Sequence, residues 1–210
     1  MSRIVVIDYQ MGNLRSVAKG LAAAGAADVL VSGNAEDIAS ADKLVLPGVG
    51  AFRDAIDHLR TAKLVDPILK YFDTGRPFLG ICLGLQLLFE RSYEDGVYEG
   101  LGVLGGQVVR FNFEEAGFHD HRLKVPHIGW NQIRKQADAP LLADVADEAY
   151  VYFVHSFYVV PTEPDVIATT TEYGVPFCSS VQLGPLFACQ FHPEKSQEVG
   201  QAILRRFVSL

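Results

Sequence analysis

The sequence predicts an α/β fold: a mostly parallel central sheet flanked by helices, with an antiparallel β extension in the second half. Two observations carry this prediction. Short β-branched runs alternate with helical patterns in the first half of the chain, as in βαβ units whose sheet is covered on both faces. After residue 105, apolar runs follow one another through tight turns. At 210 residues we expect one domain spanning 1–210.

Caps and glycines bound the elements of the first half. Asn13 is placed to cap a helix that ends before Gly25. A further helix is expected directly after Cys82. The expected strands are 3–8, 28–31, 43–46 and 77–81, and the other expected helices are 14–24, 35–40, 51–60 and 64–73.

The second half is expected to be mostly strand. A closing helix over 196–208 is the exception, with Ser196 as its cap. The expected strands are 107–111, 122–125, 131–134, 150–160, 166–171, 175–181 and 186–191.

Composition and charge exclude several classes of protein. The net charge is −7 and Lys and Arg are scattered singly, which argues against nucleic-acid binding because phosphate contacts need a clustered basic face. The N-terminus enters a strand at once without signal-peptide character. Apolar stretches reach only about a dozen residues, too short to span a bilayer. We therefore expect a cytoplasmic protein that does not bind membranes.

Cysteine and histidine spacing predicts neither disulfides nor a metal. Three cysteines, an odd number without regular spacing, suit a reducing compartment. The chain has no C-x-x-C or H-E-x-x-H motif, and His119 and His121 form an H-x-H pair in a polar loop. No metal site and no cofactor are predicted.

The segment F-L-G-I-C-L-G-L-Q at 78–86 is the most informative in the chain. It predicts a strand that runs into a helix, with Cys82 at the corner between two glycines. Such a turn lifts the central side chain clear of the sheet, and a thiol there sits over a helix N-terminus that favours its thiolate. The alternative is a close-packed corner whose glycines serve packing alone. For Cys178 and Cys189, in strand-like apolar runs, we predict buried core residues.

Phe191-His192-Pro193-Glu194 supplies a base and a group to orient it. In extended backbone, residues i and i+2 point to the same side, so Glu194 can lie beside His192. Such a pair just past a strand favours catalysis over a polar loop. His58, on the charged face of a helix, and His127 and His155, in apolar strands, are interpreted as structural.

An anionic tetrahedral intermediate also needs backbone donors. The turn Pro47-Gly48-Val49-Gly50 ends a strand and precedes a helix. We expect N–H groups of Gly48, Val49 and Gly50, together with the Leu83 N–H, to form an oxyanion hole. The P-G-x-G motif alone is weak evidence for an oxyanion hole, since most such turns only connect a strand to a helix.

Together these motifs resemble the class I (triad) glutamine amidotransferases over nearly the whole chain. More narrowly, the sequence resembles the family of glutaminase subunits of imidazole glycerol phosphate synthases. G-x-C-x-G-x-Q and H-P-E mark the superfamily. The narrower match rests on I-D-Y-Q-M-G-N-L at 7–14, P-G-V-G-A-F at 47–52, P-H-I-G-W-N at 126–131, Y-F-V-H-S-F at 152–157 and Q-F-H-P-E-K-S at 190–196.

The resemblance implies a flavodoxin-like sheet and a glutaminase reaction. Cys82 would attack the side-chain amide of glutamine to give a γ-glutamyl thioester and ammonia, with His192 moving the proton and Glu194 orienting it. Water would then release glutamate. The residues implied to bind glutamine are Gln86 and Glu94, with Ser156 and Phe157 acting mainly through their backbones.

The resemblance also implies a partner. Family members pass ammonia to a (β/α)8-barrel cyclase that forms imidazole glycerol phosphate and aminoimidazole carboxamide ribonucleotide in histidine biosynthesis. The positions that match the family's contacts with that barrel are Asn13, Trp130, Tyr152 and Lys195. The alternatives are a core aromatic for Trp130 and a solvated side chain for Lys195.

Two features depart from the family pattern. The segment 112–121 is longer than the family usually carries, and Phe157 stands where many members have tyrosine. Competing functions are an amidotransferase of another synthase, a partner-independent γ-glutamyl or peptide hydrolase, and a scaffold without activity. An intact Cys82, His192 and Glu194 argues against the scaffold, and the barrel-contact residues argue against the independent hydrolase.

Overall fold

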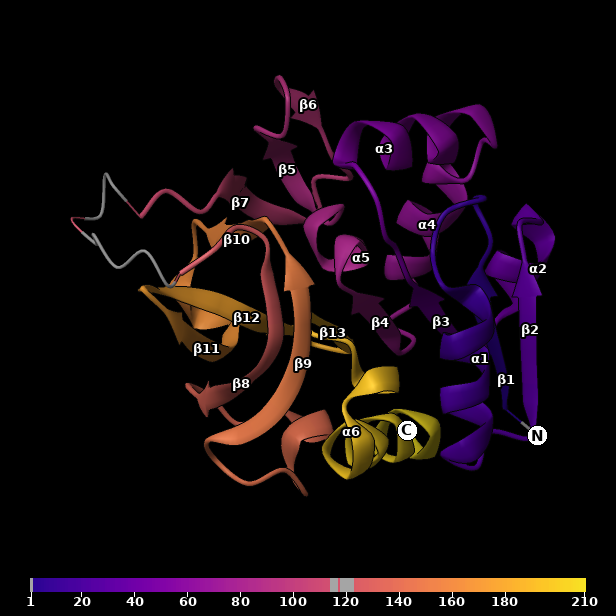
Figure 1. The fold of residues 1–210 in the computed structure, drawn as a ribbon. Helices are drawn as coiled ribbons and strands as arrows, with labels where there is room; N and C mark the ends of the chain where they lie inside the picture. Colours follow the sequence, from indigo (N-terminus) through magenta and orange to yellow (C-terminus); the bar gives the residue numbers. More distant parts are fainter. Residues whose placement is uncertain (1, 114–116, 118–122) are drawn as a thin grey trace.

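The computed structural model describes residues 2–113, 117 and 123–210. Within them, one sheet begins with a parallel part (Figure 1). In spatial order this part contains β2 (Asp28–Ser32), β1 (Arg3–Ile7), β3 (Lys43–Leu46), β4 (Phe78–Ile81) and β13 (Leu186–Cys189). These strands are short, and all but the half-buried edge strand β2 are almost fully buried, as expected for a sheet covered on both faces.

Beyond β13 the sheet becomes mainly antiparallel. The path continues through β12 (Val175–Leu183), β10 (Phe157–Pro161), β7 (Leu104–Arg110), β5 (Phe89–Ser92) and β6 (Tyr98–Glu99), with β5 and β7 parallel. A second layer branches from β12, where β11 (Ile167–Tyr173) pairs with β8 (His127–Lys135), and β8 forms a hairpin with β9 (Ala149–His155). The expected parallel sheet with an antiparallel extension is confirmed.

Helices cover both faces of the parallel part (Figure 1). Alternation along β1 sends Ile4 and Val6 into the core beside α1 (Leu14–Ala23) and α6 (Gln197–Ser209). Val5 and Ile7 pack on the other side with α2 (Ala35–Ser40), α3 (Phe52–Thr61) and α4 (Val65–Phe72). Single-turn η1 (Pro140–Leu142), η2 (Pro164–Val166) and η3 (Pro193–Lys195) lie in connections. In the described part of the chain, no helix is long and apolar enough to cross a membrane.

The helix after Cys82 is shorter than a full surface helix. It is the single turn α5 (Leu83–Gln86), because the chain enters strand β5 three residues later. Leu101 N–H donates to Leu87 O at 2.8 Å and Val103 N–H to Leu88 O at 2.9 Å, which places these carbonyls outside a helical ladder.

Three expectations for the second half are wrong in detail. The strand expected over 150–160 is two strands, β9 and β10, interrupted at Ser156. Of the strand expected at 122–125, residues 123–125 form none, and Arg122 lies outside the described residues, as do His119 and His121. Ser196 occupies the N-cap position of α6 as expected, but its side chain makes no capping bond, because its hydroxyl donates to His192 O instead.

The parallel part of the sheet determines where the functional side chains gather. Strands β3, β4 and β13 are neighbours and run the same way, so their carboxyl ends meet at one edge. Pro47, Cys82 and Gln190 follow these strands directly. Open α/β sheets bind ligands at this edge.

Candidate active site

Cys82 occupies the sharp turn between β4 and α5. Its backbone has φ 55° and ψ −109°, a left-handed conformation that costs a non-glycine residue of order 1–3 kcal/mol. The Cys82 N–H anchors the turn by donating to Cys189 O at 2.7 Å. A Cβ on Gly84 would lie 1.9 Å from Leu46 O, and one on Gly80 would lie 2.8 Å from Ala188 Cβ. Both glycines are therefore required by close packing around the elbow.

His192 and Glu194 form a buried pair beside this elbow. Their Nδ1 and Oε1 atoms are 2.8 Å apart, and the side chains are only 2% and 1% exposed. The loop is clamped, since His192 N–H donates to Tyr152 O and His192 O accepts from the Ser196 hydroxyl. Pro193 sits between the pair at the start of η3. The expected contact between residues i and i+2 is thus present, but it forms across the 3-10 turn η3 and not in extended backbone.

The protonation of His192 is set by its neighbours. Burial alone lowers its pKa, but hydrogen bonding and charge from Cys82 and Glu194 together raise the pKa to about 10. Its Nε2 is buried and makes no hydrogen bond within the described residues, although the Cys82 side chain is close enough to affect the pKa. His192 therefore holds a proton that it can exchange with a group at Cys82.

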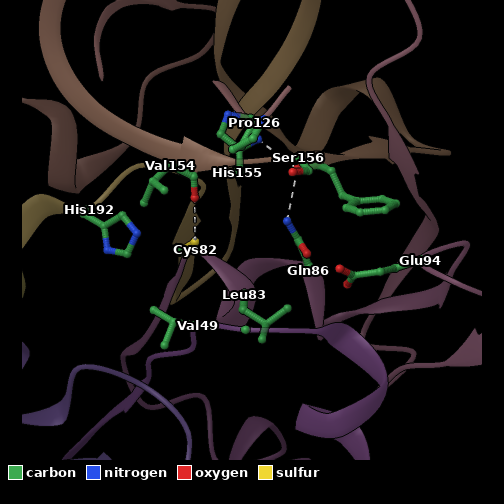
Figure 2. A pocket seen from close by; sticks show the side chains of 12 residues that line it. Val49, Cys82, Leu83, Gln86, Glu94, Pro126, Val154, His155, Ser156 and His192 are labelled. Atoms are coloured by element: carbon green, nitrogen blue, oxygen red, sulfur yellow. Dashed lines mark hydrogen bonds between the residues drawn. The ribbon is translucent and has the colours of Figure 1, made fainter. Parts of the chain in front are cut away.

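A pocket of about 340 Å³ opens over Cys82 and His192 (Figure 2). This volume lies within the range of small-molecule sites, roughly 300–1,000 Å³. Most residues that we expected to act on or bind a substrate line this pocket; Gly48 and Glu194 do not. Glu194 instead contacts His192, which lines it. The lining residues are Val49, Gly50, Cys82, Leu83, Gln86, Glu94, Pro126, Val154, His155, Ser156, Phe157 and His192.

Gln86 and Glu94 contribute polar groups to the pocket. Gln86 Nε2 donates to Phe157 O at 3.1 Å and to Gln190 Oε1 at 3.0 Å. Glu94 Oε2 accepts from Phe52 N–H at 2.7 Å, which ties the carboxylate to the start of α3. Burial raises the pKa of Glu94, and the bond from Phe52 opposes that shift. Both side chains are held by the fold before any substrate enters.

The turn after β3, residues 47–50, packs against the elbow at Leu83 and Gly84. Gly48 is packed so closely that a Cβ there would lie 2.5 Å from the Tyr9 hydroxyl and 2.8 Å from Leu83 Cβ. Tyr9 donates to Pro47 O at 2.8 Å and holds the base of the turn. Among the described residues, the N–H groups of Val49, Gly50 and Leu83 make no hydrogen bond. In the described part of the chain these backbone donors therefore have no partner.

Of the histidines that we interpreted as structural, His155 lines the pocket, and His127 is hydrogen-bonded to it. His155 Nδ1 lies 2.8 Å from Phe157 O, and His155 Nε2 lies 3.0 Å from His127 Nδ1. Burial lowers the pKa of His155 to about 3 and that of His127 to about 4. Both are hydrogen-bonded core histidines, and their link to the carbonyl that Gln86 contacts is the part that sequence reasoning missed.

Gln190 was missed as well. Its side chain is fully buried and its Nε2 lies 3.6 Å from Cys82 Sγ. The residue stands in Q-F-H-P-E, directly before the histidine motif. That position beside the motif was the available signal.

The positions that match the family's barrel contacts lie at the surface. Trp130 on β8 is 45% exposed, so it is not a core aromatic. Its ring meets Tyr152 edge-on at 6.0 Å, and Lys195 Nζ lies 5.7 Å from the centre of the Tyr152 ring. Asn13 is exposed and caps α1 by accepting from Ser16 N–H. In the described residues, no group of three or more His, Cys, Asp or Glu side chains could hold a metal.

The fold and the site define an α/β protein with a Cys–His–Glu arrangement of the kind that acyl-transfer enzymes use. The family model for class-I glutamine amidotransferases matches residues 5–210. The subunit HisH of imidazole glycerol phosphate synthase from Syntrophotalea carbinolica is 53% identical over 206 residues, covering 97% of this chain and 98% of that protein. The same protein from Aquifex aeolicus is 49% identical, covering 98% and 95%.

Solved structures agree on the fold. A glutamine amidotransferase has a TM-score of 0.72 at 16% identity, covering 98% of this chain and 99% of that one. PurLQS from Thermotoga maritima has a TM-score of 0.71 at 17% identity, covering 99% and 98%. The chain belongs to the class-I glutamine amidotransferase family and, within it, to the glutaminase subunits of imidazole glycerol phosphate synthase.

Proposed function

We propose that Cys82 is the nucleophile of a glutaminase. His192 first takes up the thiol proton and holds it, and Cys82 Sγ then attacks the side-chain carbonyl carbon of glutamine to form a tetrahedral intermediate. His192 returns the proton to the amide nitrogen, which leaves as ammonia, and a γ-glutamyl thioester remains. Water, deprotonated by His192, then releases glutamate and restores the thiol. The observation that carries the proposal is the buried His192–Glu194 pair beside a cysteine on a strained elbow.

Glu194 orients His192 in this scheme. Its carboxylate contacts Nδ1 at 2.8 Å, so Nε2 is the nitrogen left to exchange protons with the reacting atoms. A buried carboxylate also stabilises the imidazolium that forms when the thiol is deprotonated. The pKa of His192, raised to about 10, agrees with that role.

Substrate binding follows from the polar groups of the pocket. Gln86 uses its nitrogen on Phe157 and Gln190, so its Oε1 is available to accept from the α-ammonium of glutamine. Glu94 adds a carboxylate for the same group, and Ser156 and Phe157 contribute backbone atoms to the wall. The oxyanion would be bound by N–H groups of Leu83 and of the turn at Gly48, Val49 and Gly50.

In this proposal the ammonia passes to a partner protein. The relatives named above are subunits of a synthase. We propose that this chain, acting as one amidotransferase domain over residues 1–210, forms a heterodimer with a (β/α)8-barrel cyclase. That cyclase forms imidazole glycerol phosphate and aminoimidazole carboxamide ribonucleotide in histidine biosynthesis. The surface formed by Asn13, Trp130, Tyr152 and Lys195 would contact the barrel, since exposed aromatic residues of this kind anchor interfaces.

A cytoplasmic location fits this role. Cys82, Cys178 and Cys189 are all free thiols in the structure. A reducing compartment keeps such thiols available.

The test is Cys82→Ala in the complex with the cyclase. We expect glutamine-dependent synthesis to be lost and synthesis from added ammonia to be retained, because only ammonia production uses the thiol. Cys178→Ala, at a buried thiol 3.5 Å from Ser180 O, is the control and should retain both activities. Loss of both activities in Cys82→Ala would show instead that Cys82 is structural.

The isolated chain should hydrolyse glutamine poorly and be strongly stimulated by the cyclase with bound nucleotide. The turn at 47–50 is exposed at Val49, and its N–H groups need to face the oxyanion. A peptide rotation promoted by the partner would supply that orientation. Rapid turnover by the chain alone would contradict this part of the proposal.

A further inference from the structure

Gln190 lies against the nucleophile through the pairing of two parallel strands. It directly follows β13, whose Cys189 is in register with Ile81 of β4. Its N–H donates to Ser179 O at 2.9 Å, which fixes the backbone next to the elbow. The side chain is fully buried, so water does not compete for its amide group.

The direction of each hydrogen bond follows from one carbonyl. Phe157 O can only accept, so the Gln86 atom 3.1 Å away is the amide nitrogen. That nitrogen also lies 3.0 Å from the Gln190 side chain, which must therefore present its oxygen. The nitrogen of Gln190 is then the atom 3.6 Å from Cys82 Sγ, and it donates to the sulfur.

Phe157 O accepts a second hydrogen bond, from the histidine pair formed by His155 and His127. His155 Nδ1 donates to Phe157 O, so its Nε2 accepts from His127 Nδ1. His127 Nε2 in turn lies 3.4 Å from the Asn131 side-chain nitrogen, which donates to it. His155 and Gln86 thus both donate to Phe157 O, and from Gln86 the hydrogen bonds continue through Gln190 to the cysteine.

We propose that Gln190 is a positioning residue for the proposed glutaminase reaction, donating a hydrogen bond to the Cys82 sulfur while its oxygen holds Gln86 in the substrate pocket. The inference rests on the proposed function, because it assigns Gln190 to the same nucleophile. A donor to sulfur stabilises the anionic form that attacks, and bonds to charged groups are about twice as strong as neutral ones. Because one amide serves both residues, nucleophile and substrate-binding group are fixed relative to each other.

The experiment replaces Gln190 by methionine, which has similar length but neither donor nor acceptor. The rate at which iodoacetamide alkylates Cys82 is measured without glutamine, and kcat and KM are measured in the complex with the cyclase. We expect alkylation and kcat each to fall about 10- to 100-fold, the range that a lost bond to a charged group gives. Peptide mapping assigns the label to Cys82, since Cys178 and Cys189 are buried away from the pocket.

Gln182→Met is the matched control. Gln182 belongs to β12, and its amide donates to Gly184 and Leu186 carbonyls in the β12–β13 turn rather than to the pocket. It should leave the alkylation rate and kcat unchanged. Synthesis from added ammonia by the complex, together with the melting temperature, reports whether each variant is folded.

Wild-type alkylation and kcat in a folded Gln190→Met variant would overturn the proposal. If that variant does not fold, Gln190→Asn replaces it, since it keeps an amide that is one carbon too short to bridge Gln86 and the sulfur. A folded Gln190→Asn variant with wild-type alkylation would overturn the proposal equally. Absence of glutamine turnover in the wild-type complex would instead contradict the glutaminase function, whereas the alkylation rate tests Gln190 separately.

Discussion

Two histidine environments border the same pocket and differ in charge. On one side, His192 is paired with Glu194 and lies close to Cys82, and its pKa is raised to about 10. On the other, His155 and His127 lie among aromatic rings, and burial lowers their pKa values to about 3 and 4. All three side chains are nearly inaccessible to solvent. Burial alone therefore does not decide the charge of a histidine; the groups within hydrogen-bonding reach do.

The difference in charge suits the histidines to different roles, proton transfer for His192 and a structural role for His155 and His127. In the proposed reaction, a protonated His192 beside Cys82 can give up its proton. The neutral His155 instead presents a fixed N–H to Phe157 O, which also receives the amide of Gln86. In the proposed reaction, one histidine moves a proton and the other two hold the wall of the pocket.

The largest expected effect comes from removing the protonated histidine. His192→Asn should lower glutamine-dependent kcat by about 10⁴-fold or more, in line with the loss of a triad base. Steady-state assays of the complex, with glutamine and then with added ammonia, provide the measurement. His58→Asn is the control, because His58 contacts Tyr9 O outside this pocket and should leave kcat unchanged. A His192→Asn variant with kcat near wild type would remove His192 from the mechanism.

The contrast in charge predicts two pH windows for stability. The folded pKa of His192 is raised above its ordinary value of about 6.5, so its contribution is fully present below that pH and is lost as pH rises through about 10. For His155 and His127 the folded pKa is lowered. Their contribution to stability is therefore present above about pH 6.5, and it is lost as pH falls through about 4 for His127 and about 3 for His155.

NMR titration of the histidine rings, together with the free energy of unfolding against pH, measures both windows. Glu194→Gln should shift the His192 titration to lower pH and leave His155 and His127 unchanged. Three histidines titrating near 6.5 would contradict the comparison.

A smaller effect is expected from replacing one of the neutral histidines, His155. His155→Leu removes the donor to Phe157 O and leaves Gln86 less well held, so KM for glutamine should rise about tenfold. The loss of a buried hydrogen bond should also lower the free energy of unfolding by about 1–3 kcal/mol. Initial-rate kinetics and denaturant titration check the two values. If KM is unchanged, the histidine pair does not shape the substrate wall.

The smallest effect is expected at the serine that holds the His192 loop. Ser196 donates to His192 O at 2.6 Å and accepts from Tyr152 N–H at 3.0 Å. Ser196→Ala should lower the free energy of unfolding by about 1 kcal/mol and reduce kcat only a few-fold. Ser209→Ala, at an exposed serine that bonds Arg206 O at the end of α6, is the matched control and should change neither value. Equal effects of both substitutions would argue against a special role for Ser196.

The sequence is sufficient to predict the parallel half of the fold and the elbow. Short apolar strands and glycines act locally, so β1, β3 and β4 and the turn at Cys82 follow from neighbouring residues. His192 and Glu194 are two residues apart, so their contact is local, although it forms across the 3-10 turn η3 and not in the extended backbone that we expected.

The rest of the site depends on long-range pairing that no local pattern encodes. Gln190 meets Cys82 because β13 lies beside β4, although 108 positions separate the two residues. His127 meets His155 through the β8–β9 register. Ser196 looks like a helix cap in the sequence, but its hydroxyl is drawn to His192 O. Such contacts are decided by topology.

The central claim is that Cys82 forms a covalent intermediate with glutamine. The complex with the cyclase is mixed with glutamine, quenched in acid during turnover, digested, and the peptide containing Cys82 is analysed by mass spectrometry. We expect this peptide to gain the mass of one γ-glutamyl group, and we expect the adduct to be absent in Cys82→Ala and strongly reduced in His192→Asn. An unmodified Cys82 peptide in an actively turning-over complex, or the adduct on Cys178 or Cys189, would contradict it.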